Sequence, residues 1–367
     1  MDSTLATNES VPRPRGARLA AYLALAYLLL IVYASLTPFT GGWRDPAVGL
    51  WSFLLAPWSR HIRRFDTFIN FLAYIPLGFL LALALQSRLS IKAALMASTL
   101  CGFTLSLGME AVQMYLPART SSTLDILTNG LGGFTGALIA AREEVRGLIA
   151  VRLAEFRDRW FIHGSLGDLG LVLLGLWFVS QLNPSLPLLG IVFFSERVDS
   201  IAHRFSLMGS LSVMCNLVSI GLLLMVLMRT ARVAIIAMLV LLLAASVIKL
   251  LAAAALLKPE ALLQWLTAES VIGIGYGLFI VAASLLLTIR QIIPVCAFAL
   301  AAGIFVAHLH AGESRSSLAL HLFSWHYGHL LNFTGLARIV AELWPFTALG
   351  YLYLLVQRLR AGIRHRV

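Results

Sequence analysis

The sequence has few charged residues and few cysteines, and both shortages limit the classes of protein to which it can belong. Charged residues make up 12% of its 367 residues and hydrophobic residues 59%, against about 25% and about 45–50% in soluble domains. The three cysteines, Cys101, Cys215 and Cys296, each lie inside an apolar run, without disulfide-like or metal-like spacing. We therefore expect them to be buried as small hydrophobic residues. This composition excludes a soluble core and indicates an integral membrane protein.

Long apolar runs recur along the whole chain. A helix needs about 20 predominantly apolar residues to cross the hydrocarbon core of a bilayer. Runs close to that length cover residues 18–38, 66–87, 92–116, 123–141, 166–183, 205–228, 232–257, 268–289, 291–310 and 338–357. The sequence therefore predicts an all-α fold, a polytopic bundle of about ten transmembrane helices. Histidines interrupt a further run at 318–333, so we expect a re-entrant or interfacial helix there.

Basic residues outnumber acidic ones, with 28 Lys and Arg against 17 Asp and Glu. A basic balance can indicate nucleic-acid binding, but these arginines occur in short bursts between apolar runs, which is typical of membrane topology. Sorting the basic residues by alternate loops places most of them on the side of the N-terminus. By the positive-inside rule, we expect both termini in the cytoplasm and no nucleic-acid partner.

The chain divides at a polar connection before its middle. Residues 1–17 are a polar N-terminus, and no small-residue cleavage site follows the first apolar run, so we expect an uncleaved first span. Residues 18–142 form a four-span unit, residues 143–164 an amphipathic cytoplasmic linker, and residues 165–367 a second transmembrane region. Two connections, 43–64 and 142–160, have the composition of surface helices, because they mix apolar or aromatic residues with arginines.

Spans two to four carry polar side chains at helical spacing. Polar residues are four positions apart at 66, 70 and 74 and again at 125 and 129, and three positions apart at 110 and 113. At these spacings the residues of each group share one face of a helix. An arginine lies in the turn between spans three and four. Because these positions fall near the outer ends of the spans, we expect them to converge in the outer half of the bilayer. The set is Asp66, Asn70, Glu110, Gln113, Arg119, Asp125 and Asn129.

Ionisable groups at membrane depth are costly, and they are taken as functional sites by default. We expect the set to bind a ligand, with Arg119 contacting a phosphate or carboxylate. If the protein is an enzyme, the candidate general bases are Asp66, Glu110 and Asp125. No metal motif, cofactor motif or nucleophile–His–Asp arrangement accompanies them, so no metal and no cofactor is predicted. Two alternatives stay open: the set couples transport, or it only locks helices together.

A definite order of motifs runs through these spans. It consists of Asp66-Thr67-Phe68-Ile69-Asn70 with Pro76-Leu77-Gly78, then Glu110-Ala111-Val112-Gln113 with Arg119, then Asp125 to Gly133, after an opening span that contains residues 33–39. In these features the chain resembles the VanZ-like membrane protein family, named for a teicoplanin-resistance protein, over about residues 18–142. The resemblance implies the bacterial cytoplasmic (inner) membrane, a cell-envelope role linked with antibiotic resistance, and a lipid-linked, glycan or glycopeptide-type ligand at the polar set. The second transmembrane region extends beyond this unit.

The second region has two polar features of its own. Lys249 lies inside the run 232–257, and we expect it to form an ion pair, for which Glu269 is the candidate partner, or otherwise to serve transport. A group of histidines follows on the outward side: His308, His310, His321, His326 and His329. No zinc-enzyme helix motif is present among them, so interfacial hydrogen bonding or a proton-linked role is expected before metal binding.

Overall fold

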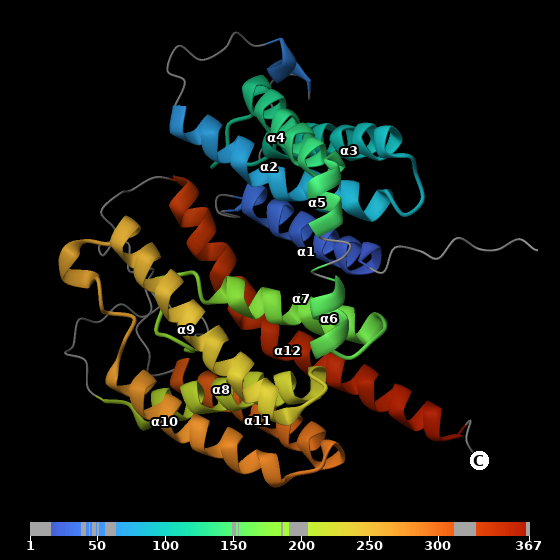
Figure 1. Ribbon diagram of the computed structural model, residues 1–367. Coiled ribbons are helices and arrows are strands. Elements are labelled where there is room, and N and C mark those ends of the chain that lie inside the picture. The colour runs from blue at the N-terminus through green and yellow to red at the C-terminus, as the bar shows by residue number, and fades with distance from the viewer. Residues whose placement is uncertain are drawn as a thin grey trace, which may run out of the picture. The chain divides into compact units, whose positions relative to one another are not determined.

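The computed structural model describes residues 16–37, 42–43, 45, 49, 51–55, 64–148, 152, 154–184, 186–190, 205–311 and 328–364 (Figure 1). Within these ranges the chain is helical apart from its connections and one isolated bridge between Phe161 and Met228, so the all-α prediction is confirmed. The longer helices are α1 (Ala17–Leu36), α2 (Arg64–Leu85), α3 (Ile91–Gln113), α4 (Thr123–Ala141), α7 (Ser165–Ser180), α8 (Leu207–Leu227), α9 (Ala231–Leu256), α10 (Ala268–Ala283), α11 (Ile289–Ala311) and α12 (Gly328–Arg364).

Nine helices in the described part of the chain are long and apolar enough to cross a membrane, and the chain is a multi-pass membrane protein. The predicted fifth span, 166–183, differs from the others because α7 has only 16 residues. At 1.5 Å per residue it extends about 24 Å, which is less than the ~30 Å of the hydrocarbon core. The chain leaves the helix at Gln181, just before Asn183-Pro184, and continues as non-helical backbone.

The chain forms two compact units. The first comprises Met1–Val32 and Phe39–Arg157, and the second comprises Tyr33–Pro38 and Asp158–Val367. The boundary at Arg157 falls within the linker expected at 143–164. In the described residues of that linker the chain forms two short helices, α5 (Glu143–Gly147) and α6 (Ala154–Trp160).

In the first unit, α2 and α4 pack backbone against backbone. A Cβ atom at Gly78 would overlap the carbonyl of Gly133, and a Cβ at Gly136 would overlap the carbonyl of Ile75. On the other side of α4, a Cβ at Gly133 would lie 3.8 Å from the Cα of Gly102 in α3. Small residues therefore allow three membrane helices to approach closely, as they do in many transmembrane interfaces.

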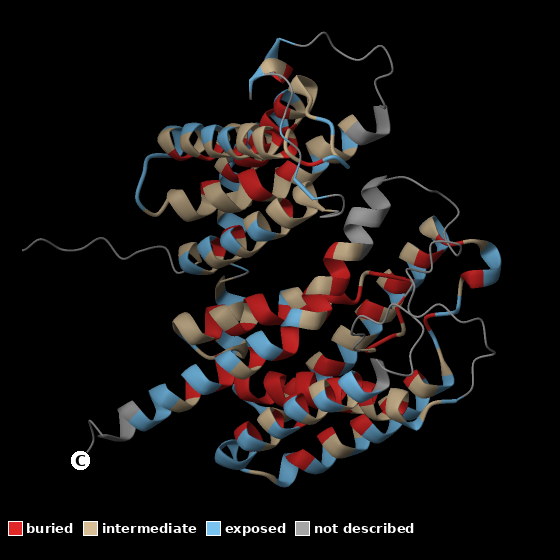
Figure 2. Ribbon diagram, turned by 180° about the vertical axis from the view of Figure 1, so that it is seen from behind, coloured by how far each residue is buried: buried red, intermediate tan, exposed pale blue. Residues whose placement is uncertain are grey.

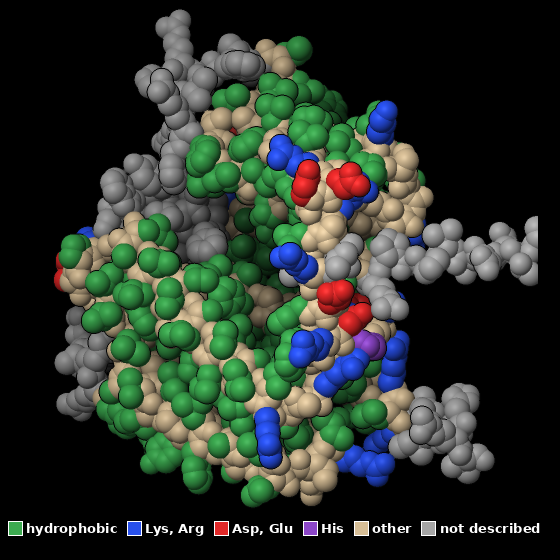
Figure 3. All heavy atoms as spheres, in the orientation of Figure 1, with side chains coloured by type: hydrophobic (Ala, Val, Ile, Leu, Met, Phe, Trp, Pro, Cys, Tyr) green, Lys and Arg blue, Asp and Glu red, His purple; other side chains and the backbone are tan. Residues whose placement is uncertain are grey.

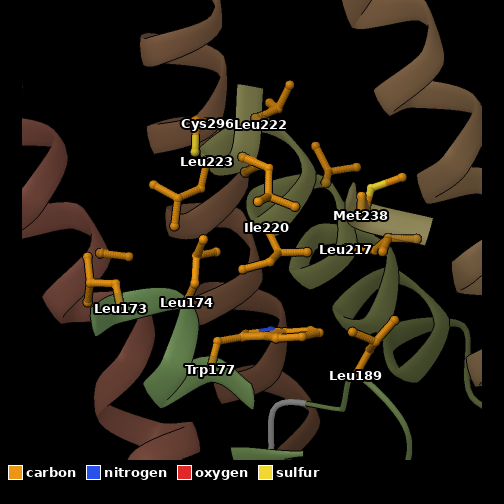
Figure 4. Close-up of a cluster of buried hydrophobic side chains, with 14 of the residues drawn as sticks. Leu173, Leu174, Trp177, Leu189, Leu217, Ile220, Leu222, Leu223, Met238 and Cys296 are labelled. Atoms are coloured by element: carbon orange, nitrogen blue, oxygen red, sulfur yellow. The ribbon is translucent and has the colours of Figure 1, made fainter. Parts of the chain in front are cut away.

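In the second unit, α8 forms the centre and is buried along most of its length (Figure 2). Helices α10 and α11 pack along α8, and α12 packs along α7. Figure 4 shows the apolar cluster at this centre, to which α7, α8, α9 and α11 all contribute: Leu173, Leu174, Trp177, Leu189, Leu217, Ile220, Leu222, Leu223, Met238 and Cys296. Cys215 and Cys296 are buried free thiols, as expected, whereas Cys101 is partly buried.

Two surface expectations fall largely on residues outside the described part of the chain. The described part of residues 43–64 that precedes α2 contains one turn of 3₁₀ helix, η1 (Ser52–Leu54), and no longer helix. The first part of the predicted interfacial run, 318–327, lies outside the described residues. Its last part, 328–333, belongs to the start of α12. The helix expected at 338–357 is therefore the middle of a single helix of 37 residues.

We expect Gly78→Ala to destabilise the protein, because the added methyl group meets the backbone of α4. Overpacking of this kind typically costs about 1–3 kcal/mol. Gly108→Ala in α3 is the matched control, since a Cβ there has no atom within 4 Å and alanine favours the helix by up to about 1 kcal/mol. Thermal unfolding in detergent measures both variants. Equal melting temperatures for the two would contradict the close contact between α2 and α4.

Candidate functional site

The buried face of α3 leads to the candidate site. Its buried residues recur every three to four positions along the helix, and α2 and α4 pack on this helix. They are Ala94, Ser98, Gly102, Ser106, Glu110 and Gln113. The two longest polar side chains, Glu110 and Gln113, therefore lie at the C-terminal end of α3, next to the turn that leads into α4.

Glu110 holds this turn through two groups. Its side chain, which is 4% exposed, accepts a hydrogen bond from the backbone N–H of Ser122 at 2.7 Å. Its main-chain carbonyl accepts another from the hydroxyl of Ser121, also at 2.7 Å. Ser122 immediately precedes α4 and its own side chain makes no capping bond, so Glu110 joins the end of one span to the start of the next. A bond to a buried carboxylate is stronger than one between neutral groups.

Arg119 lies in the turn that Glu110 holds. Its backbone N–H donates to the carbonyl of Leu116 at 3.1 Å, which closes the turn locally, and its side chain is half-buried. Burial lowers the pKa of the Arg119 guanidinium, and the negative charge of Glu110 raises it. A guanidinium stays charged despite such shifts. The turn thus presents a permanent positive charge within electrostatic reach of a buried carboxylate.

A second polar contact lies deeper in the same unit. The Nδ2 atom of Asn129 in α4 donates to the hydroxyl of Ser106 in α3 at 2.9 Å. The buried Tyr74 of α2 lies close to the same Ser106 hydroxyl. Among the described residues, neither the Tyr74 hydroxyl nor the Asn129 side-chain oxygen has a hydrogen-bond partner of standard geometry. Polar side chains from all three helices therefore meet below the turn.

The remaining members of the predicted set lie near the same end of the unit. Asp125 is half-buried in the first turn of α4 and acts electrostatically on Glu110. Asn70 is half-buried on α2, next to Phe71, whose carbonyl packs against Gly132 of α4. Gln113 is buried. Asp66 belongs to α2, but its side chain lies outside the described part of the structure.

Two parts of the candidate site were not predicted from the sequence: one residue of α3 and the segment before α2. Ser106 continues the four-residue repeat Ser98, Gly102, Ser106, Glu110, and that repeat was the signal that could have found it. The second is the segment before α2. The hydroxyl of Thr123 donates to the carbonyl of Phe53 at 3.0 Å, and the rings of Trp43 and Tyr115 are 6.2 Å apart. These contacts place an interfacial segment beside the turn.

The arrangement suits recognition of an anion better than acid–base catalysis. Arg119 can donate to a phosphate or carboxylate in a fork geometry. The candidate base Glu110 is already bonded to the backbone of the turn that carries Arg119. In the part of the chain that the structure describes, no group of three or more His, Cys, Asp and Glu residues is placed to hold a metal ion.

The second unit places Lys249 differently from the expectation. Lys249 is fully buried in α9, and its Nζ donates to the main-chain carbonyl of Gln181 at 3.1 Å. Among the described residues no carboxylate pairs with it, because the Oε1 of Glu269 instead accepts from the backbone N–H of Ser206 at 3.0 Å. Gln181 follows α7 directly, and the carbonyls at a helix C-terminus favour a cation. Lys249 therefore caps the short helix α7.

The predicted histidine group lies mostly beyond the described structure. His308 is exposed near the end of α11. His321 and His326, and the side chains of His310 and His329, lie outside the described residues.

Comparison with known proteins identifies the first unit only. The model of the family described as VanZ/LLP1 matches residues 21–145, which contain every member of the predicted polar set. This match confirms the resemblance found over about residues 18–142. No curated protein and no solved structure matches the chain.

We expect Glu110→Ala to lower the stability of the protein, because the partly buried N–H of Ser122 loses its acceptor at a cost of about 1 kcal/mol. Glu110→Gln keeps an oxygen that can accept this bond, so its loss should be smaller. The control is Glu143→Gln, at an exposed position in α5. Thermal unfolding in detergent measures all three. A Glu110→Ala variant as stable as Glu143→Gln would show that the bond to Ser122 does not hold the turn.

Proposed function

Since the VanZ/LLP1 family model matches residues 21–145, we propose that the chain is a bacterial cell-envelope protein whose outward-facing intramembrane site binds an anionic headgroup. The ligand class is a lipid-linked, glycan or glycopeptide-type molecule, and Arg119 contacts its phosphate or carboxylate. The proposed location is the cytoplasmic (inner) membrane, with both termini in the cytoplasm. The placement of Arg119 is the observation that carries this proposal.

Arg119 has the features of a ligand contact. It is half-buried, so the charge is partly desolvated yet still reachable from outside the bundle. Electrostatic attraction is stronger where water is partly excluded. The turn that carries it is tied at Leu116, Ser121 and Ser122, so little ordering would be required on binding.

The surrounding polar residues divide into two roles. Glu110, Ser106 and Asn129 are buried and bonded to neighbouring elements, so they position the turn and the three helices. Asn70 and Asp125 are half-buried at the same end, where they can contact a ligand. Catalysis by Glu110 or Asp125 is not required for this function.

The alternative of a transporter has less support in the first unit. A transport path needs polar groups from one side of the membrane to the other. The buried face of α4 is polar only at Asn129, and beyond it consists of the small residues Gly130, Gly132, Gly133, Gly136, Ala137 and Ala140. These residues close the contact with α2 and α3. The pattern favours a site that opens to one side.

A binding measurement with the purified full-length protein tests the proposal. The probe is undecaprenyl phosphate, titrated into protein in lipid nanodiscs and detected by native mass spectrometry. We expect Arg119→Ala to weaken binding about tenfold, because it removes a charge-assisted contact worth roughly 1.4 kcal/mol. Arg119→Lys should weaken it less, because the charge remains while the fork geometry is lost.

Arg88→Gln is the matched control, since Arg88 is exposed in the connection between α2 and α3. Thermal unfolding of each variant separates binding from folding. Unchanged binding in Arg119→Ala would reject the proposed role of Arg119. A loss of stability in that variant, with binding retained, would favour the scaffold alternative.

A further inference from the structure

A group of exposed arginines lies on the second unit, apart from the site of the first unit. Each belongs to a helix terminus or to the connection beside one. They are Arg159, Arg229, Arg232, Arg290, Arg358 and Arg360. We refer to the surface that they form as the arginine end. Figure 3 shows Lys and Arg side chains gathered there around a histidine.

The connections of the helices explain why these arginines share one end. Residues 228–230 join α8 to α9, and residues 284–288 join α10 to α11. Helices joined by short connections run antiparallel, so these two connections fall on the same side, while the connection from α9 to α10 falls on the opposite side. Figure 1 shows both connections and the C-terminal end of α12 on one side of this unit.

Backbone contacts fix part of the arginine end rigidly. The N–H of Ile162 donates to the carbonyl of Leu227 at 2.9 Å, and the N–H of Arg229 donates to the carbonyl of Trp160 at 3.0 Å. These bonds hold the segment after α6 against the end of α8. The guanidinium of Arg229 then lies 2.5 Å from the Nε2 of His163, and that of Arg159 lies 5.1 Å from the centre of the Trp160 ring.

Large apolar side chains are exposed beside the arginines. Leu286 is 89% exposed, and Ile289 next to Arg290 and Leu359 between Arg358 and Arg360 are also exposed. Arginine next to exposed leucine and isoleucine, with a partly exposed tryptophan, is the composition found where acyl chains meet lipid headgroups. An acidic protein partner would not require these apolar neighbours.

The acidic residues near this surface belong to α6, where Glu155 is exposed one turn before Arg159. They are not on α9 or α11, which carry Arg232 and Arg290. Asp158 lies 3.6 Å from the Nδ1 of His163, and its side chain is largely covered. The nearest other acid of this unit in the sequence, Asp168, is buried in the first turn of α7. At the opposite end, Glu260 lies two residues after Lys258 in the connection between α9 and α10, so no comparable excess of positive charge is described there.

We propose that the arginine end of the second unit binds the phosphate groups of anionic phospholipids. Arg229, Arg232 and Arg290 contact the headgroups, while the neighbouring apolar side chains lie against the acyl chains. Each arginine near a membrane surface adds to the attraction for anionic lipid, and guanidinium groups match the geometry of phosphate oxygens. The site requires neither Arg119 nor the ligand of the first unit.

Lipid retention by the full chain tests this proposal. The protein is placed in nanodiscs of equal parts phosphatidylglycerol and phosphatidylcholine, and the lipids that stay bound are identified by native mass spectrometry. The wild type should retain phosphatidylglycerol preferentially, and added salt should weaken this preference because salt screens exposed charges. We expect Arg229→Gln/Arg232→Gln/Arg290→Gln to reduce the preference about tenfold.

Lys258→Gln, at the opposite end, is the matched control and should retain the preference. If the triple variant does not fold, the single variant Arg290→Gln replaces it, since this exposed side chain lies in the first turn of α11. Equal retention of the two lipids by the wild type, or an unchanged preference in the arginine variants, would overturn the proposal. Arg119→Ala should leave the preference intact, so this result is independent of ligand binding in the first unit.

Discussion

The close approach of the α2 and α4 backbones is the constraint on which the rest of the first unit depends. Glycine at 78, 132 and 136 leaves no side chain between the two helices, so their carbonyl groups lie against each other's backbone. Inside such a contact each polar group needs a partner from a neighbouring helix, since lipid offers none. The bonds of Glu110 to Ser122 and of Asn129 to Ser106 meet this need for the Glu110 carboxyl group and the Asn129 amide nitrogen.

The two units satisfy their buried polar groups in different ways. In the first unit, side chains of α3 and α4 bond to each other and to a turn at one end. In the second, side chains satisfy a buried stretch of non-helical backbone. The side chain of Gln181 accepts from the N–H of Leu189, Asn216 donates to the carbonyl of Leu189, and Ser270 donates to the carbonyl of Leu188. Irregular backbone at membrane depth persists only under such cover.

The sequence was most informative where periodicity determines structure. Spacing of three and four residues placed Glu110, Gln113 and Asn129 on faces that the structure buries, and run lengths located the spans. Periodicity does not show where a helix stops inside the membrane. In the structure α7 ends at Ser180, earlier than the apolar run predicted. Lys249, for which an acidic partner was expected, donates to the carbonyl of Gln181, which this early end leaves without a helical partner. Nor could spacing show that Glu110 bonds to a backbone N–H twelve residues later, because that bond depends on the path of the turn.

The bond between Glu110 and Ser122 also constrains how the chain enters the bilayer. The carboxyl group lies in α3, but its donor belongs to the turn that starts α4, which leaves the ribosome later. A carboxylate that enters lipid before its partner has been made bears the full cost of desolvation. The bond that covers this carboxyl group can therefore form only after the turn and the start of α4 have followed α3 out of the ribosome. Until then, the side chain of Glu110 is a polar group of α3 that lipid cannot satisfy.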